Sequence, residues 1–297
     1  MDIQNGDTDI GLKGVRVGVV GLGIMGSAIA GNLRRAGNQV WGFDPLPAAC
    51  ESARSIGIQI VSNLASVPDR TVLVLTSLPS GDSLRQTVET LGSGLSTSCV
   101  LGELSTLSLQ DKQQARVILR ARGIDLLDAP VSGTGAQAID RDLSVYVSGH
   151  ETSWKRVEGF FKCFAQRPRY VGEFGCGTRL KYLANLLVAI HNVASAEAMA
   201  MAEATGIDLH AAIEILRESA GNSRIFELRA PMMARREYLP ATMKLEVWQK
   251  DMALIAQFAR ESKIRTPLFD ATKPIYETAL RMRPQEDTAG VFEVLRS

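Results

Sequence analysis

A glycine-rich turn near the start of the chain limits its possible folds more than any other feature. The segment Gly21-Leu22-Gly23-Ile24-Met25-Gly26 follows an apolar run over residues 15–20 and precedes an apolar helical stretch that reaches about Ala36. In such a turn the first glycine permits the tight bend, the second lets the backbone approach a pyrophosphate, and the third packs helix on strand. The helix N-terminus then favours an anion. We therefore predict a dinucleotide-binding fold, with residues 21–26 around the cofactor.

The acidic residue that such a fold needs is Asp44. It follows a predicted strand over residues 39–43 and stands 18 positions after Gly26, near the spacing at which a carboxylate meets the ribose hydroxyls. The next residues, Pro45 to Pro47, include no arginine for a 2′-phosphate. This pattern predicts NAD as the cofactor, with NADP as the weaker candidate. Asp44 could also simply begin the turn before Pro45.

The first half of the chain alternates strands with helices. Candidate strands cover residues 15–20, 39–43, 71–76, 99–103, 124–128, 143–148 and 169–171. Several are continuously apolar, which is typical of strands covered on both faces. We predict a Rossmann-type α/β domain with a doubly wound, mostly parallel sheet over residues 14–173. Ligands bind beyond the carboxyl ends of such strands, so Ser77-Leu78-Pro79 and Ser105-Thr106 are expected to line the crevice.

The second half carries helical patterns only. Residues 179–205 are apolar nearly all round and rich in alanine, which predicts a helix buried on every side. Asp208 is a candidate cap for the next helix, and Pro231, Pro240 and Pro267 are expected to separate the remaining ones. We predict an all-helical substrate and dimerisation domain over residues 174–297, after a loose leader over residues 1–13.

Composition excludes several classes of partner. The chain has 33 basic and 32 acidic residues, so it offers no electrostatic attraction for nucleic acid or for an anionic membrane. The long apolar stretch contains Asn185, His191 and Glu197, which favours a buried helix over a membrane span. No CxxC pair or histidine cluster suggests a metal. The first residues match neither a signal nor a transit peptide, and we expect a cytoplasmic protein.

Three further segments reveal a resemblance. They are residues 128–138 (DAPVSGTGAQA), residues 175–185 (GCGTRLKYLAN) and Lys250-Asp251. Together with GLGIMG they resemble the β-hydroxyacid dehydrogenase family, which includes 3-hydroxyisobutyrate dehydrogenase, tartronate semialdehyde reductase and 6-phosphogluconate dehydrogenase. The resemblance covers about residues 15–292.

The resemblance implies a role for each matching residue. Lys181 would be the general acid/base and Asn185 would position the substrate. Ser132 and Gly133 would hold the substrate carboxylate, beside Thr134. Leu78, Pro79, Thr106 and Lys250 would contact the cofactor. Taken without the resemblance, Lys181 and Lys250 could be surface lysines, and Ser132-Gly133 could be a helix cap.

These assignments imply reversible hydride transfer between a nicotinamide and a small 3-hydroxy acid or semialdehyde acid. A lysine ordinarily titrates near about 10.4, so burial near the cofactor is expected to lower the pKa of Lys181. The alternatives are an imine reductase-like enzyme, against which Lys181 argues, and a non-catalytic dinucleotide-binding scaffold. Thr134, Ala184 and Arg224 depart from the family pattern in ways that concern the substrate pocket. The apolar helix predicts a homodimer or homotetramer.

Overall fold

The computed structural model describes residues 12–296, and most of the predicted leader lies outside them. The chain divides into two compact units, one ending at Lys181 and the other beginning at Tyr182. Helix α7 (Cys176–Ala204) starts in the first unit and continues into the second. We describe each unit by itself.

The first unit is built on a six-stranded parallel sheet. Its strands are β1 (Arg16–Val20), β2 (Gln39–Phe43), β3 (Gln59–Ile60), β4 (Thr71–Thr76), β5 (Val100–Glu103) and β6 (Asp125–Asp128), in the order β3-β2-β1-β4-β5-β6. This order confirms the predicted Rossmann-type sheet. Val20 is in register with Phe43 on one side and with Thr76 on the other. The loops after β1, β2 and β4 therefore emerge at the same edge.

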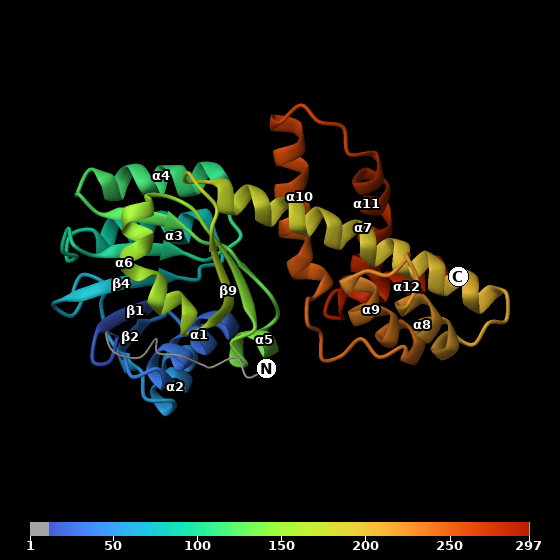
Figure 1. Ribbon diagram of the computed structural model, residues 1–297, viewed down its shortest axis with the longest axis horizontal. Coiled ribbons are helices and arrows are strands. Elements are labelled where there is room, and N and C mark those ends of the chain that lie inside the picture. The colour runs from blue at the N-terminus through green and yellow to red at the C-terminus, as the bar shows by residue number, and fades with distance from the viewer. Residues whose placement is uncertain (1–11, 297) are drawn as a thin grey trace, which may run out of the picture. The chain divides into compact units, whose positions relative to one another are not determined.

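Helices cover both faces of this sheet (Figure 1). On one face α1 (Ile24–Arg35), α2 (Pro47–Ser55) and α6 (Glu151–Lys162) pack in a core that includes Ile29, Leu73 and Phe161. On the other face α3 (Gly81–Leu91) and α4 (Leu109–Arg120) pack in a core that includes Val74 and Leu119. Leu73 and Val74 are neighbours in β4 and point to opposite faces, as strand geometry requires.

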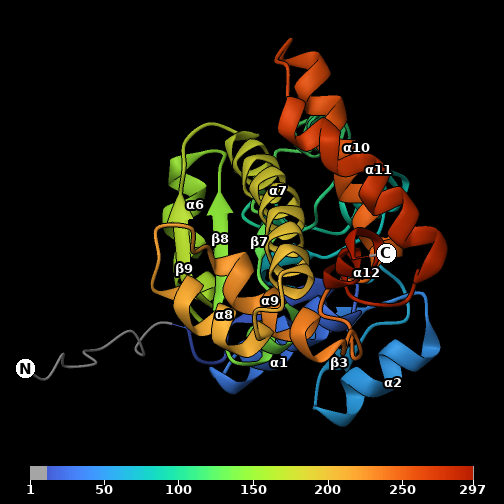
Figure 2. The same cartoon turned by 90° about the vertical axis from the view of Figure 1, so that its right-hand side faces the viewer.

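The last strands of this unit form a small second sheet. It has the order β7-β8-β9, with β7 (Val131–Ser132) antiparallel to β8 (Leu143–Val147), and β8 parallel to β9 (Ala165–Tyr170) (Figure 2). The short helix α5 (Gly135–Ile139) joins β7 to β8. An isolated bridge between Asp128 and Ser148 connects this sheet to the end of β6. Strand β9 begins four residues before the predicted start at 169.

The second unit is helical throughout its described residues. It contains the rest of α7, then α8 (Leu209–Arg217), α9 (Arg224–Arg235), α10 (Leu245–Glu261), α11 (Pro267–Met282), a 3-10 turn (Thr288–Val291) and α12 (Phe292–Leu295). Helices α10 and α11 run side by side in both views (Figures 1 and 2). Trp248, Phe269 and Phe292 are buried together in its core. Asp208 caps α8 by accepting a hydrogen bond from the Ala211 amide, as predicted.

Two expectations for this half are wrong. Pro231 does not separate helices but lies inside α9, where Ala230 and Met233 are fully buried in the core and hold the helix in place. Helix α7 is not buried on every side of the single chain, because Leu183, Leu187 and Met201 are 50%, 51% and 69% exposed. By length and composition α7 could cross a membrane, a test that the core helix of a soluble protein also passes.

Candidate active site

The glycine turn has the geometry that a bound pyrophosphate needs. Gly21 has a φ of +87°, and a Cβ there would lie 2.1 Å from the Ser77 carbonyl oxygen. A Cβ on Gly26 would lie 1.8 Å from the Gly21 carbonyl oxygen, so α1 can sit this close to the turn only with glycine. A Cβ on Gly23 would meet nothing within 4 Å. Gly23 caps α1 without a side chain, so open space adjoins the first helical N–H groups.

The other residues of the turn differ in exposure. Leu22 is buried, Met25 is half-buried, and Ile24 is 79% exposed. The Leu22 amide donates to Oδ2 of Asp44 at 2.7 Å, and the Leu46 amide donates to Oδ1 at 2.8 Å. Asp44 is therefore held directly beside the glycine turn, at the place predicted for a ribose ligand.

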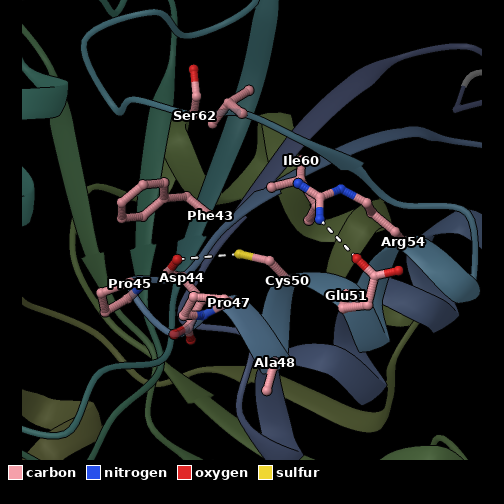
Figure 3. A pocket seen from close by; sticks show the side chains of 11 residues that line it. Phe43, Asp44, Pro45, Pro47, Ala48, Cys50, Glu51, Arg54, Ile60 and Ser62 are labelled. Carbon is pink, nitrogen blue, oxygen red and sulfur yellow. Dashed lines mark hydrogen bonds and ion pairs between the residues drawn. The ribbon is translucent and has the colours of Figure 1, made fainter.

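A pocket of about 530 Å³ lies beside Asp44 (Figure 3). Phe43, Ile60 and Ser62 line it from the strand side, and α2 closes it with residues that include Glu51 and Arg54. An ion pair of 3.1 Å joins Arg54 to Glu51. The open space over Gly23, the carboxylate of Asp44 and this pocket together fit the pyrophosphate, ribose and base of a dinucleotide.

Arg54 lines this pocket and is not among the residues that the sequence predicts to bind the cofactor. The residues directly after Asp44 include no arginine, but an arginine farther along the chain could still reach a phosphate there. Arg54 stands ten positions later, in the last turn of α2. The i, i+3 spacing of Glu51 and Arg54 on a helix that follows β2 was the signal available.

The loops after β4 and β5 are tied together at the same edge of the sheet. Ser105 Oγ accepts a hydrogen bond of 2.7 Å from the Leu78 amide. The Ser105 amide donates to Oε1 of Glu103 at 2.9 Å. Thr106 is half-buried and Pro79 is exposed. The structure thus brings together the two segments that were expected to line the crevice.

Lys181 and Ser132 also lie near each other within the first unit. The Nζ of Lys181 is 3.5 Å from the Oγ of Ser132, and both residues are half-buried. Gly133 follows with a φ of +145° and is exposed. Thr134 is the N-cap of α5: its Oγ1 accepts from the Gln137 amide at 3.3 Å, and Gln137 Oε1 accepts from the Thr134 amide at 3.0 Å. A hydroxyl, the amine nitrogen of a lysine and an exposed glycine backbone therefore adjoin one another.

The turn that carries Lys181 is anchored by Asp128. Asp128 is fully buried, and its oxygens accept from the amide of Thr178 at 2.8 Å and from its hydroxyl at 2.7 Å. Buried Lys112, on α4, binds Asp128 at 2.9 Å and Glu103 at 2.6 Å. Burial disfavours the charged lysine, but the attraction of Asp128 and Glu103 prevails and raises the pKa of Lys112. No pattern in the sequence around Lys112 predicts this role.

Asn185 and Lys250 belong to the second unit. Asn185 is buried one turn beyond Lys181 on α7, and its Nδ2 donates to Oδ2 of Asp251 at 2.8 Å. Lys250 precedes Asp251 on α10 and is exposed. Among residues 12–296 no group of three or more histidine, cysteine, aspartate or glutamate side chains could hold a metal ion.

Two family models match the chain in succession. Residues 16–173 match the NAD-binding domain of 6-phosphogluconate dehydrogenase. Residues 175–295 match the model described as NAD-binding of NADP-dependent 3-hydroxyisobutyrate dehydrogenase. The two matches meet next to the predicted domain boundary.

Characterised relatives match over nearly the full length. L-Threonate dehydrogenase of Escherichia coli is 31% identical over 92% of this chain and 90% of its own. A solved structure of Mycobacterium tuberculosis 3-hydroxyisobutyrate dehydrogenase with L-serine is 25% identical, covers 96% of this chain and 100% of its own, and superposes with a TM-score of 0.89. An imine reductase from Myxococcus stipitatus is 17% identical with a TM-score of 0.64, which shows a shared fold alone.

The glycine turn, Asp44 and the nucleotide-sized pocket agree with these matches. The matched residues run through both units almost without interruption. The chain therefore belongs to the β-hydroxyacid dehydrogenase family of nicotinamide-dependent oxidoreductases, which act on small hydroxyacids.

Proposed function

We propose that the protein interconverts a small hydroxyacid and its carbonyl form with Lys181 as the general acid/base. The observation that carries this proposal is the 3.5 Å separation between Lys181 Nζ and Ser132 Oγ, next to the exposed backbone of Gly133. A side chain that can take a proton thus adjoins groups suited to a carboxylate.

The residues divide the work as follows. Ser132 and the Gly133 backbone bind the substrate carboxylate, and Thr134 fixes that backbone by capping α5. Lys181 in its neutral form takes the proton from the substrate hydroxyl, and in the reverse direction its ammonium group returns it. Asn185, one turn along α7, positions the hydroxyl. The oxidised nicotinamide supplies the hydride acceptor when it is bound.

Cofactor binding falls to a separate set of residues. We assign it to Gly21, Leu22, Gly23, Ile24, Met25, Gly26, Asp44, Leu78, Pro79, Thr106 and Lys250. The first six form the glycine turn, and Asp44 is hydrogen-bonded to that turn and lines the pocket. The β4 and β5 loops share a hydrogen bond. Lys250 rests on the family pattern and on its exposure.

For the substrate we propose a hydroxyacid of the size of L-threonate or 3-hydroxyisobutyrate, because relatives with these names match at 31% and 25% identity. The test is a panel of L-threonate, 3-hydroxyisobutyrate, L-serine and 6-phosphogluconate with NAD and NADP, followed by absorbance of the reduced nicotinamide. We expect turnover of one of the unphosphorylated acids. Turnover of 6-phosphogluconate alone would overturn the assignment.

Lys181→Ala should lower turnover by on the order of 10²–10⁴-fold while leaving cofactor binding within about threefold, since it removes a positioned acid/base. Lys181→Arg should fail as well, because a guanidinium does not release its proton in this range. The measurements are steady-state kinetics and a fluorescence titration with NADH.

The matched control is Arg179→Ala, which removes an exposed cation from the same turn of α7. It should leave turnover within about threefold. Normal turnover in Lys181→Ala, with an unchanged circular dichroism spectrum, would refute the assignment.

We also expect a homodimer or homotetramer in the cytoplasm. Leu183, Leu187 and Met201 expose apolar surface along α7, and a second copy would remove it from water. Light scattering coupled to gel filtration at micromolar concentration should give twice or four times the chain mass of 32.2 kDa. A mass of one chain at that concentration would contradict this.

A further inference from the structure

A buried charge network lies beneath the predicted catalytic lysine. Its members are Glu103 at the end of β5, Lys112 on α4 and Asp128 at the end of β6, and all three are fully buried. Lys112 Nζ lies 2.6 Å from Oε2 of Glu103 and 2.9 Å from Oδ1 of Asp128. Two carboxylates therefore share one ammonium group away from water.

Each carboxylate also holds a separate part of the first unit. Through its other oxygen, Glu103 accepts the Ser105 amide, and Ser105 in turn accepts the Leu78 amide. Asp128 accepts from the amide and hydroxyl of Thr178, which stands in the first turn of α7. Lys112 is thus the common partner of the β5 loop and of the start of α7.

The start of α7 is also held by Ser148 and by close packing against β8. Ser148 Oγ accepts from the amides of Gly175 and Gly177, and the same hydroxyl lies 3.0 Å from Oδ2 of Asp128. A Cβ on Gly177 would lie 2.2 Å from the Tyr146 carbonyl oxygen, so the helix begins tightly against β8. Lys181 follows Thr178 by three residues, which is nearly one helical turn. Any shift of this turn moves Lys181 relative to Ser132.

We propose that Lys112 is a positioning residue for the reaction, which sets the place of Lys181 through Asp128 and the first turn of α7. The proposal rests on the acid/base role proposed for Lys181. When the ammonium group of Lys112 is removed, two buried carboxylates face each other without a counter-charge, and at least one of them must move or take up a proton. A displaced Asp128 loses its hydrogen bonds from Thr178, and a protonated Asp128 accepts them more weakly because they are no longer charge-assisted. The lysine on that turn then loses its alignment with the substrate.

A purely structural Lys112 would behave differently. It would change the stability of the folded protein, but each folded molecule would turn over substrate at the parental rate. The matched control is Arg229→Met, because Arg229 also forms a buried ion pair, with Asp287, but in the second unit and on α9. Both substitutions remove one buried cation, from two carboxylates in Lys112→Met and from one in Arg229→Met.

The experiment compares Lys112→Met, Thr178→Val and Arg229→Met with the parent as full-length proteins at equal folded concentration. The probe substrate is L-threonate or the panel acid with the highest turnover. We expect Lys112→Met to lower kcat by roughly 10- to 100-fold with KM changed by less than about threefold, the loss typical of a misplaced catalytic group. Thr178→Val removes one donor only, and we expect a smaller loss of roughly 3- to 10-fold. Arg229→Met should keep the parental kcat.

A second readout needs neither substrate nor cofactor. Amide hydrogen exchange of the peptide that covers residues 174–185 should become at least about tenfold faster in Lys112→Met and faster in Thr178→Val. In Arg229→Met the exchange of this peptide should not change. If Lys112→Met does not fold, Thr178→Val alone decides: parental kcat and parental exchange in that variant overturn the proposal.

The role of Lys112 and the acid/base role of Lys181 can be refuted separately. If Lys181→Ala is inactive and Lys112→Met keeps both the parental kcat and the parental exchange, only the role of Lys112 is refuted. If Lys181→Ala retains turnover, the acid/base assignment is refuted, whatever Lys112→Met does.

Discussion

Asp44 shows how one side chain prepares a binding site before any ligand arrives. Its two oxygens each accept a backbone amide, one from Leu22 in the glycine turn and one from Leu46 before α2. A carboxylate oxygen has further lone pairs, so the fixed group can still accept from a ribose hydroxyl. The same negative charge repels a 2′-phosphate. Arg54 lines the same pocket, but its charge is already matched by Glu51.

We therefore expect NADH to bind at least about tenfold more tightly than NADPH, since two like charges in contact cost several kcal/mol. Asp44→Ala should weaken the binding of NADH and reduce the difference in affinity between NADH and NADPH. Fluorescence titration of both reduced cofactors measures these affinities. Asp69→Ala, which removes an exposed carboxylate in the loop before β4, is the control and should preserve the preference. Tighter binding of NADPH to the parent would reverse our conclusion.

Among the elements, strands that form a clear run between turn residues were predictable, and very short strands were not. The strands β2 and β4 have the predicted bounds. Each is a run of mainly strand-favouring residues flanked by turn residues. β3 and β7 have two residues each, too few to show a pattern. β9 contains Arg167, Pro168 and Arg169, which are typical of a loop. It is nevertheless a strand because it lies at the edge of its sheet, where proline is tolerated.

The proximity of the candidate site residues was predictable to the same extent. The glycine turn and Asp44 follow from local spacing around one strand and helix, which a sequence displays directly. The link between Glu103, Lys112 and Asp128 does not, because it joins two strand ends and a helix through the interior. A lysine with polar neighbours in sequence is ordinarily a surface residue, and only the packed structure shows that Lys112 is buried.

Three glycine-to-alanine substitutions in the turn and in α1 distinguish an effect on packing from an effect on cofactor binding. Gly26→Ala should destabilise the fold, because its Cβ would overlap the Gly21 carbonyl oxygen. Gly23→Ala should keep stability within about 0.5 kcal/mol, since its Cβ meets no protein atom. It should nevertheless weaken the binding of NADH by at least about tenfold, because the methyl group would occupy the space of the pyrophosphate.

Gly31→Ala is the control in the same helix, because its Cβ would make an ordinary contact of 3.5 Å with Ile56. It should leave NADH affinity unchanged and raise the free energy of unfolding by up to about 1 kcal/mol, because alanine is favoured over glycine inside a helix. Thermal unfolding and NADH titration measure both effects. Parental NADH affinity in Gly23→Ala would show that the pyrophosphate binds elsewhere.

At the scale of the whole molecule, each unit has its own interior and its own buried ion pairs. In the second unit Asp287 is fully buried and bound by Arg229, by Thr242 and by the amides of Met243 and Ala289. Burial alone would raise the pKa of Asp287, but Arg229 and these donors outweigh it and hold the pKa below its ordinary value. A lowered carboxyl pKa stabilises the fold above the unfolded value of about 3.9. That contribution is lost as the pH falls through the folded value.

Asp287→Asn should therefore lower the free energy of unfolding at pH 7 by about 3–5 kcal/mol, because it leaves Arg229 buried without its anion. The difference from the parent should shrink once the pH falls below about 4. Urea unfolding between pH 7 and pH 2.5, followed by circular dichroism, measures it. Asp270→Asn removes an exposed ion pair with Lys273 and should cost under about 1 kcal/mol. A difference that stays constant to pH 2.5 would contradict the linkage.

The buried network of Glu103, Lys112 and Asp128 also limits how the sequence can diverge. Loss of the lysine leaves two buried carboxylates without a counter-charge, whereas loss of one carboxylate still leaves a pair of opposite charges. A joint change of all three residues to apolar ones of similar volume can be neutral for stability or even stabilising. The effect of a substitution at one of the three positions should therefore depend on the residues at the other two positions. A redesign of this part of the interior has to consider all three residues together. In a library randomised at all three positions, active variants should rarely combine a carboxylate at position 103 or 128 with an apolar residue at position 112.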